Sequence, residues 1–280
     1  MSKHEYTRRD FLGRAGLGMA LVAAPSCRSI PGGASGSLAF TFVQLCDTQL
    51  GMGGYEHDVE TFRQAVAQIN SLKPDFVVIC GDLVHDSDDE SFADVKDIKA
   101  GFDVPCHCAP GNHDVGNTPT PESLQHYREV IGKDYYSVEH KGYVFVFVNT
   151  QLWKAPVEGE SQRHDAWLEQ TLETAAMRRL PVFIVGHYPL FLEKPVEAEE
   201  YMNLPLARRK ALLDLFERSG VVAVLGGHTH RLVINDYKGM QLVNGETTSK
   251  NFDKRPLGFR VWHVMDPGSF RHEFVALDGF

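Results

Sequence analysis

Five short polar clusters, each directly after a hydrophobic run, carry the residues of this chain that could do chemistry. They are Asp47-Thr48-Gln49, Gly81-Asp82, Gly111-Asn112-His113-Asp114, Gly186-His187 and Gly227-His228-Thr229-His230. Each preceding run predicts a buried strand, and a metal-centred active site needs carboxylates, amides and imidazoles at such strand ends. One cluster would be weak evidence, but five in succession predict a metal-dependent hydrolase.

The donor atoms of these clusters are hard oxygens and imidazole nitrogens. Asp47 offers an anionic oxygen, Asp82 lies in a tight Gly-Asp turn and can bridge two cations, and Asn112 offers an amide oxygen. The imidazole nitrogens come from His187, His228 and His230. Mixed nitrogen and oxygen ligation fits Mn, Fe or Zn better than Ca or a thiolate-preferring metal. Two such cations would polarise a phosphoryl oxygen and lower the pKa of a bridging water.

Strands and helices must alternate to place these clusters. Buried strands are predicted over residues 40–46, 76–80, 104–109, 182–185 and 221–225. Apolar residues at spacings of three and four predict helices over 57–72, 89–100, 119–131, 164–179 and 204–219. A hairpin over 135–148 and short strands after residue 231 complete the pattern. We therefore expect an α/β fold with two packed mixed β-sheets, a β-sandwich flanked by α-helices, as one domain over 38–280.

The composition is that of an ordinary soluble globular protein. The 280 residues are 43% hydrophobic and 23% charged, with a net charge of −9. Nucleic-acid binding is not expected, because it favours a basic stripe that this sequence lacks. The basic pairs and triplets, such as Arg178-Arg179 and Arg208-Arg209-Lys210, fall in or beside predicted helices and are interpreted as solvated faces.

The N-terminus carries a different signal. Thr7-Arg8-Arg9-Asp10-Phe11-Leu12, followed by an apolar Gly/Ala-rich stretch over 13–24, resembles a twin-arginine export signal. An ordinary basic helix is the alternative. Ala24-Pro25-Ser26-Cys27 loosely resembles a lipoprotein box, so lipidation of Cys27 and ordinary signal-peptidase cleavage both stay open. Residues 1–37 are thus predicted to be a signal peptide and a flexible tether, and the protein periplasmic or membrane-anchored.

Four further cysteines lie at the ends of predicted core strands. They are Cys46, Cys80, Cys106 and Cys108. A small apolar thiol is the usual reason for cysteine at such positions. Cys106-His107-Cys108 has no second cysteine pair after it, so a zinc clip is not expected.

The ordered clusters resemble the calcineurin-like metallophosphoesterase superfamily, whose pattern is Asp-x-His, Gly-Asp, Gly-Asn-His-Asp/Glu, His and Gly-His-x-His. The resemblance implies a β-sandwich flanked by helices and a centre of two divalent or trivalent ions, Mn, Fe, Zn or Mg. One ion would take Asp47, Asp82 and His230. The other would take Asp82, Asn112, His187 and His228. The resemblance also implies that Asn112 and His113 contact the phosphate and that His113 protonates the leaving oxygen, with Asp114 orienting the His113 ring.

The first cluster departs from that pattern, because Gln49 stands where the superfamily has His. An amide oxygen is a weaker ligand than imidazole, which predicts lower occupancy of the first metal and a preference for Mn or Mg. Asp-x-Gln also resembles the eukaryotic calcineurin-like phosphoesterase-domain proteins that act as protein Ser/Thr phosphatases, as does Gly258-Phe259-Arg260. His85 stands where purple acid phosphatases carry a metal-bound Tyr, so an iron-tyrosinate centre is not expected.

These observations predict an exported phosphoesterase that cleaves phosphate esters through attack by a metal-bridging water, more readily a phosphomonoesterase acting on proteins or small molecules. A phosphodiesterase acting on cyclic nucleotides or phospholipid head groups is the alternative. A non-catalytic surface lipoprotein has only Gln49 in its favour. Substrate choice is expected to depend on the loops over 51–57, 151–162 and 191–204. Within or beside them, four residues either line the pocket or merely pack: Tyr55, His57, Gln151 and Tyr188.

Overall fold

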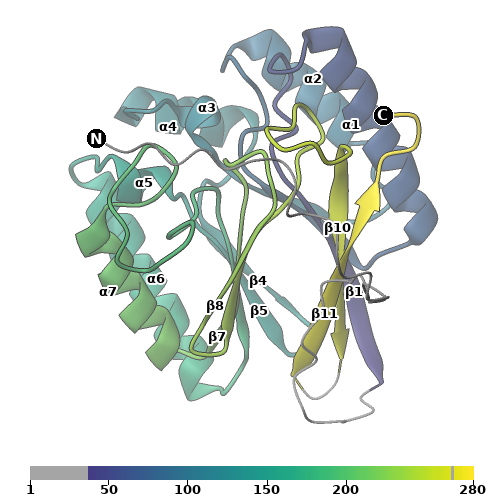
Figure 1. Cartoon of the computed structure of the whole chain (residues 1–280). Helices are drawn as coiled ribbons and strands as arrows, with labels where there is room; N and C mark the ends of the chain where they lie inside the picture. The colour runs from purple at the N-terminus through teal and green to yellow at the C-terminus, as the bar shows by residue number, and fades with distance from the viewer. Residues whose placement is uncertain (1–36, 266–267) are drawn as a thin grey trace, which may run out of the picture. The chain divides into compact units, whose positions relative to one another are not determined.

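Two β-sheets lie face to face and helices cover their outer faces, as Figure 1 shows for the computed structural model. The structure describes residues 37–265 and 268–280. The predicted export signal and Cys27 lie outside the described residues.

The first sheet has five strands. In order across the sheet they are β11 (Ser269–Ala276), β10 (Gly258–Met265), β1 (Leu38–Leu45), β2 (Phe76–Cys80) and β3 (Cys106–Ala109). β1, β2 and β3 run parallel, whereas β10 is antiparallel to β1. Helices α1 (Tyr55–Leu72), α2 (Asp89–Lys99) and α4 (Pro121–Val130) pack their apolar faces on the outside of this sheet.

The second sheet has six strands. In order they are β4 (Tyr136–His140), β5 (Tyr143–Phe147), β6 (Val182–Val185), β7 (Val221–Gly226), β9 (Met240–Asn244) and β8 (Val233–Tyr237). β5, β6, β7 and β9 run parallel, and the two outer strands pair antiparallel as hairpin partners. Helices α6 (Glu160–Met177) and α7 (Leu206–Arg218) pack on its outer face.

Alternation along the strands builds the interior. In β1, Phe40 and Phe42 point between the sheets, whereas Val43 and Leu45 join the core under the helices. Aromatic rings fill the space between the sheets; the ring centroids of Phe145 and Phe183, on neighbouring strands, lie 4.9 Å apart with the rings nearly parallel. Because both faces of the central strands are buried, their sequences are continuously apolar.

The predicted architecture is confirmed, with local differences. The predicted strands over 76–80 and 182–185 coincide with β2 and β6, but β3 begins two residues later than predicted, at Cys106. Two single-turn helices, α3 (Asn112–Val115) and α5 (Gln151–Lys154), were not predicted, because four residues are too few to show helical periodicity. Cys46, Cys80 and Cys108 are buried thiols, and Cys106 is half-buried.

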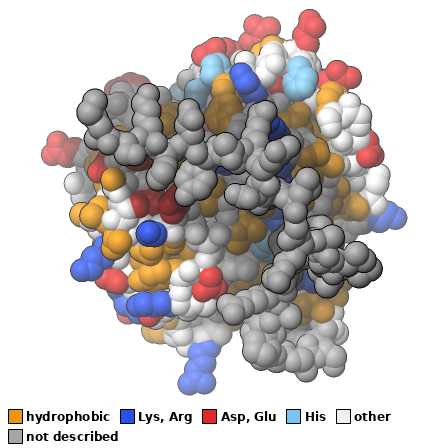
Figure 2. Space-filling model, viewed as in Figure 1, with side chains coloured by type: hydrophobic (Ala, Val, Ile, Leu, Met, Phe, Trp, Pro, Cys, Tyr) orange, Lys and Arg blue, Asp and Glu red, His pale blue; other side chains and the backbone are white. Residues whose placement is uncertain are grey.

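The described surface carries both signs of charge. On the face drawn in Figure 2, Lys and Arg side chains lie interspersed with Asp and Glu side chains. Within the described part of the chain, no helix combines the length and apolar character that a bilayer span requires.

Candidate metal centre

All five polar clusters come together at one edge of the two sheets. Asp47 follows β1, Asp82 follows β2 and Asn112 begins α3 just after β3, all in the first sheet. His187 follows β6, while His228 and His230 follow β7, in the second sheet. Because the carboxyl ends of parallel strands meet at one edge, residues far apart in the sequence become neighbours there.

The backbone at these positions is held in a rarely adopted conformation. Among the described residues, nine that are not glycine have a positive φ, and five of these are predicted ligands. The five are Asp47, Gln49, Asp82, His228 and His230, with φ between 34° and 69°. The other four are lysines and an arginine in turns or at helix ends. Because such a conformation costs energy, its concentration here indicates selection for side-chain placement.

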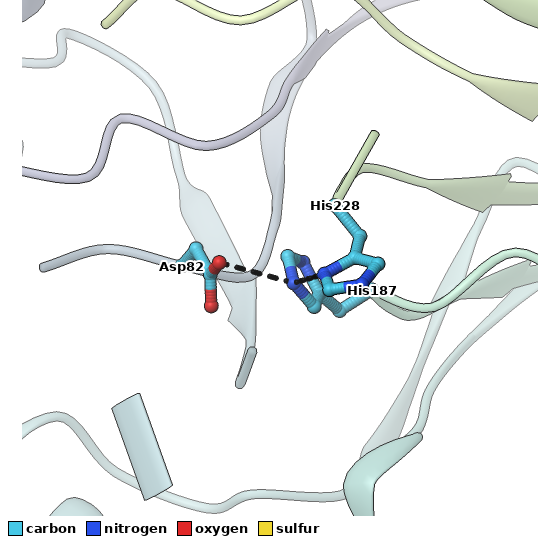
Figure 3. A group of neighbouring side chains, drawn as sticks. All are labelled: Asp82, His187 and His228. Atoms are coloured by element: carbon cyan, nitrogen blue, oxygen red, sulfur yellow. Dashed lines mark hydrogen bonds and ion pairs between the residues drawn. The ribbon is translucent and has the colours of Figure 1, made fainter. Parts of the chain in front are cut away.

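One donor group consists of Asp82, His187 and His228, which Figure 3 shows pointing toward one another. His187 Nε2 lies 3.2 Å from Asp82 Oδ2 and 3.2 Å from His228 Nδ1. The same nitrogen lies 3.1 Å from Asn112 Oδ1. Four atoms with lone pairs therefore surround one buried point, which is the arrangement that a cation stabilises.

A second donor group consists of Asp47, Asp82 and His230, whose ligand atoms lie within 4.8 Å of one another. His230 Nε2 is 3.6 Å from Asp47 Oδ1. Both Asp47 oxygens also accept the His228 amide, at 2.9 and 3.0 Å, which fixes that carboxylate in place. Asp82 belongs to both groups, so one carboxylate is common to them.

Backbone carbonyls orient the imidazoles. His187 Nδ1 lies 2.8 Å from the carbonyl oxygen of Cys80, and His230 Nδ1 lies 2.6 Å from that of Lys250. A carbonyl can only accept, so each Nδ1 carries the proton in the neutral ring and each Nε2 presents a lone pair. Both Nε2 atoms are the ones that face the carboxylates.

Charge coupling within the cluster shifts several pKa values. Burial alone would raise the pKa of Asp82, but the adjacent His187 outweighs burial and lowers it well below its usual range. Burial alone would lower the pKa of His187, yet Asp82 raises it to about 10. Burial and then the charge of His187 lower the pKa of His228 to about 3. The buried carboxylates thus favour a positive charge beside them, which a bound cation would supply.

Gln49, two residues after Asp47, has a buried side-chain oxygen that could bind a metal ion. Its side chain is buried, and its Oε1 has no hydrogen-bond partner among the described residues. Its Nε2 lies 3.5 Å from His85 Nδ1. A buried amide oxygen without a partner is costly, and a cation would remove that cost. The carboxylate, amide and imidazole donors of the two groups are suited to hard or borderline metal ions.

The structure corrects the role expected for Asp114. Its Oδ1 accepts the amides of Leu83 and Val84 at 2.8 and 3.3 Å, and its Oδ2 accepts that of Gly111 at 2.7 Å. Burial, and then the negative charge of Asp82, raise the pKa of Asp114 to about 8. Asp114 therefore fixes the turn that follows Asp82 and does not hold the His113 ring.

His113 is oriented by a different neighbour. Its Nδ1 lies 2.7 Å from the carbonyl oxygen of His85, and the two imidazole rings stack with centroids 4.7 Å apart. The His113 amide donates to Asp82 Oδ1 at 2.9 Å, which ties the histidine to the shared carboxylate. His113 is half-buried, so its ring remains accessible to a substrate while being fixed on one side.

Two glycines of the motifs are required by close approach. A Cβ at Gly111 would lie 2.1 Å from Asp82 Oδ1, and a Cβ at Gly227 would lie 2.5 Å from Asp47 Oδ2. Any side chain at either position would displace a carboxylate of the centre. The glycines in Gly-Asn-His-Asp and Gly-His-Thr-His thus make room for the ligands.

The sequence left open whether Tyr55, His57, Gln151 and Tyr188 line the pocket or merely pack, and the structure shows the contacts of each. Tyr55 donates to Asp94 on α2, and His57 contacts the buried Asp58. Gln151 donates to the Asn117 carbonyl, so these three serve loop packing. Tyr188 is buried, with its ring centroid 3.9 Å from that of His228. It therefore packs directly behind a predicted ligand.

Two exposed aromatic residues beside the centre were not predicted. Tyr201 lies near His228 with ring centroids 5.0 Å apart, and Phe252 stacks on His230 at 4.6 Å. Both lie in irregular loops, where no periodic pattern or motif marks them. The only sequence signal was the position of Tyr201 within the loop over 191–204.

A family model described as Calcineurin-like phosphoesterase matches residues 40–232, the span that contains every predicted ligand. The chain belongs to the calcineurin-like phosphoesterase family. This phosphoesterase is 34% identical over 264 residues to Serine/threonine-protein phosphatase CPPED1 of Danio rerio, covering 85% of each chain. It is 27% identical over 211 residues to Glycerophosphodiester phosphodiesterase GpdQ of Enterobacter lignolyticus, covering 73% of this chain and 74% of that protein.

The fold has solved counterparts. The crystal structure of a dimetal phosphatase from Danio rerio aligns with a TM-score of 0.61 at 18% identity, covering 82% of this chain and 94% of that one. This phosphoesterase is therefore a metal-dependent hydrolase of phosphate esters with the expected fold. Its two donor groups, joined at Asp82, provide for two metal ions.

Proposed function

We propose that this phosphoesterase is a phosphomonoesterase that acts on phosphoserine or phosphothreonine in proteins or on small phosphate monoesters. The observation that carries the proposal is the paired donor group around Asp82 with His113 fixed beside it. The preference for monoesters is supported by similarity to a Ser/Thr phosphatase over 85% of the chain, at higher identity and coverage than the similarity to a diesterase.

The residues would divide the work as follows. Asp47, Asp82, Asn112, His187, His228 and His230 would hold the metal ions, with Gln49 supplying a further oxygen. When bound, the ions would polarise the phosphoryl group and lower the pKa of a coordinated water. His113 would contact the phosphoryl group and give a proton to the departing alcohol oxygen. The His85 carbonyl and the Asp82 carboxylate hold His113 in position for this transfer.

A phosphodiesterase is the second candidate, because GpdQ of Enterobacter lignolyticus is a relative over 73% of the chain. A substrate panel separates the two. We expect the Mn-loaded enzyme to hydrolyse p-nitrophenyl phosphate and a phosphoserine peptide with a higher kcat/KM than bis-p-nitrophenyl phosphate or glycerophosphodiesters. The reverse order across Mn, Fe, Zn and Mg would establish the diesterase instead.

Gln49 offers a direct test of the donor group formed by Asp47, Asp82 and His230. We expect Gln49→His to tighten metal binding by about 10- to 100-fold, because imidazole replaces a neutral amide oxygen two positions after Asp47. Isothermal titration calorimetry with Mn and Zn measures the change in metal affinity. Gln44→His is unsuitable as a control, because Gln44 is buried between the sheets. Gln125→His, on an exposed helix face, is the matched control. Unchanged metal affinity in Gln49→His would remove Gln49 from the centre.

We also propose export by the twin-arginine route, with a periplasmic or membrane-anchored mature protein. Support comes from Thr7-Arg8-Arg9-Asp10-Phe11-Leu12, the apolar stretch after it and Cys27. Replacing Arg8 and Arg9 by Lys should leave the precursor in the cytoplasm. Mass spectrometry of the mature N-terminus distinguishes a lipidated Cys27 from ordinary cleavage, and an intact N-terminus at Met1 would contradict export.

A further inference from the structure

The loop over residues 192–204, which we term the arch, joins β6 to α7 beside the metal centre and is built around a carboxylate. Glu197 accepts the backbone amides of Leu192, Glu193 and Lys194 at 2.7, 2.7 and 2.9 Å. It also accepts Asn203 Nδ2 at 2.8 Å. One side chain therefore ties the start of the arch to its end, and a loop with so many charge-assisted bonds keeps one conformation.

A buried arginine holds the arch from below. Arg209 on α7 donates to the carbonyls of Pro195, Glu197 and Leu204 at 2.9, 2.9 and 2.8 Å. Its side chain is fully buried, so the prediction that the basic triplet at 208–210 is a solvated face is wrong for this residue. Burying a guanidinium is costly unless it is well bonded, and here the arch supplies the acceptors.

A lysine fixes the far side of the arch. Lys154 Nζ, on the short helix α5, donates to the carbonyls of Glu200 and Asn203 at 2.6 and 2.7 Å. These two acceptors flank Tyr201 closely in the sequence. Two charged side chains from other elements, Lys154 and Arg209, thus join Glu197 of the arch in fixing the backbone on both sides of Tyr201.

The arch presents Tyr201 to the metal centre. The Tyr201 carbonyl lies 3.4 Å from His228 Nε2, and its hydroxyl lies 3.2 Å from Asn112 Nδ2. The residue nevertheless remains 53% exposed. It therefore contacts two predicted ligands on one side and faces solvent on the other, which is the position of a substrate-contacting side chain.

The Tyr201 hydroxyl donates only a long hydrogen bond among the described residues. Because Asn112 Oδ1 faces His187, its Nδ2 must be the atom that donates to the Tyr201 oxygen. The Tyr201 proton then points elsewhere: its hydroxyl also bonds with that of Tyr188, and Asn117 Oδ1 accepts it at the long distance of 3.5 Å. A hydroxyl that accepts one strong bond and donates one weak bond can turn its proton to a better acceptor.

We infer that Tyr201 is a substrate-binding residue. Its hydroxyl donates a hydrogen bond to a terminal phosphoryl oxygen of a phosphate monoester held beside Asn112 and His228. The inference rests on the proposed function and deepens it. A monoester dianion offers one more anionic terminal oxygen than a diester, and hydrogen bonds to charged acceptors are stronger than those to neutral ones. Tyr201 therefore favours monoesters over diesters.

Tyr201→Phe tests the inference, because it removes the hydroxyl and keeps the ring against His228. We expect kcat/KM for p-nitrophenyl phosphate to fall by about 10- to 100-fold, and that for bis-p-nitrophenyl phosphate by less than about threefold. The Kd of inorganic phosphate for the Mn-loaded protein, measured by calorimetry, should weaken by a factor similar to the monoester loss. Mn affinity should not change.

Tyr55→Phe is the matched control, since the Tyr55 hydroxyl bonds to Asp94 on α2 rather than to the metal centre. It should leave both substrates and phosphate binding as in the wild type. Equal losses for monoester and diester, weakened Mn binding, or no change in Tyr201→Phe would overturn the inference. A failure of the proposed function would look different, because the wild type itself would then hydrolyse no monoester. Comparing the phosphate affinities of the wild type and Tyr201→Phe would still test the role of Tyr201.

Discussion

Asp82→Asn is expected to lower kcat/KM for phosphate monoesters by roughly 1000-fold or more, because one carboxylate serves both donor groups. The substitution is nearly isosteric, but it replaces an anionic bridging group by a neutral amide. It also weakens the acceptor of the His113 amide, which lies 2.9 Å from Asp82 Oδ1. A single change should therefore disturb both metal positions and the proposed proton donor.

Thermal unfolding with and without Mn separates this effect from misfolding. In the wild type, Mn should raise Tm, since a ligand that binds only the folded state stabilises it. In Asp82→Asn that Mn-dependent rise should be largely lost; the rise is the quantity compared, because loss of the charged contact with His187 also changes the Tm without metal. Asp97→Asn is the control, because Asp97 is exposed and pairs with Arg63 at the surface. Full activity in Asp82→Asn would refute the shared-carboxylate assignment.

His113→Gln is expected to reduce kcat without removing metal. General acid catalysis contributes about 10²- to 10⁴-fold, so losses of that order are expected for an alkyl phosphate such as phosphoserine. His113 belongs to neither donor group, so Mn affinity should stay as in the wild type. Single-turnover kinetics combined with metal titration gives the rate of hydrolysis and the Mn affinity on one sample.

The leaving group provides an internal check on the role of His113. p-Nitrophenolate departs without needing a proton, so His113→Gln should lose much less activity on p-nitrophenyl phosphate than on phosphoserine. His126→Gln, a substitution at a half-buried position of α4 that packs against Phe92, should match the wild type on both substrates. An equal loss on both substrates would show that His113 binds the phosphate without acting as the acid.

Much of the fold was predictable because its signals are local. Runs such as Phe76–Cys80 and Val182–Val185 are apolar throughout because both faces of these strands are buried, and the structure has strands there. The ligand positions follow from the same logic, since a polar residue after a buried parallel strand must lie at its carboxyl edge. Asp82 and His187 could thus be placed near each other although 105 positions separate them in the numbering.

The roles of several other residues could not be predicted, because they depend on long-range contacts that leave no local pattern in the sequence. Arg209 is one residue of a basic triplet, and only the three carbonyls of the arch explain its burial. Asp114 is adjacent to His113 in sequence, yet the turn directs its carboxylate to Leu83 and Val84. Tyr201 lies in an irregular loop whose course is set by charged groups from other elements. Such placements require the folded backbone.

The most direct test of the central claim is metal stoichiometry measured together with hydrolysis on the same protein. Stripped protein would be titrated with Mn while p-nitrophenyl phosphate turnover and bound metal are followed. The two donor groups predict that binding saturates at two ions per chain, that turnover rises with occupancy, and that Asp82→Asn shows neither. Turnover that is unaffected by stripping, or a protein that binds no Mn, Fe, Zn or Mg, would contradict the account.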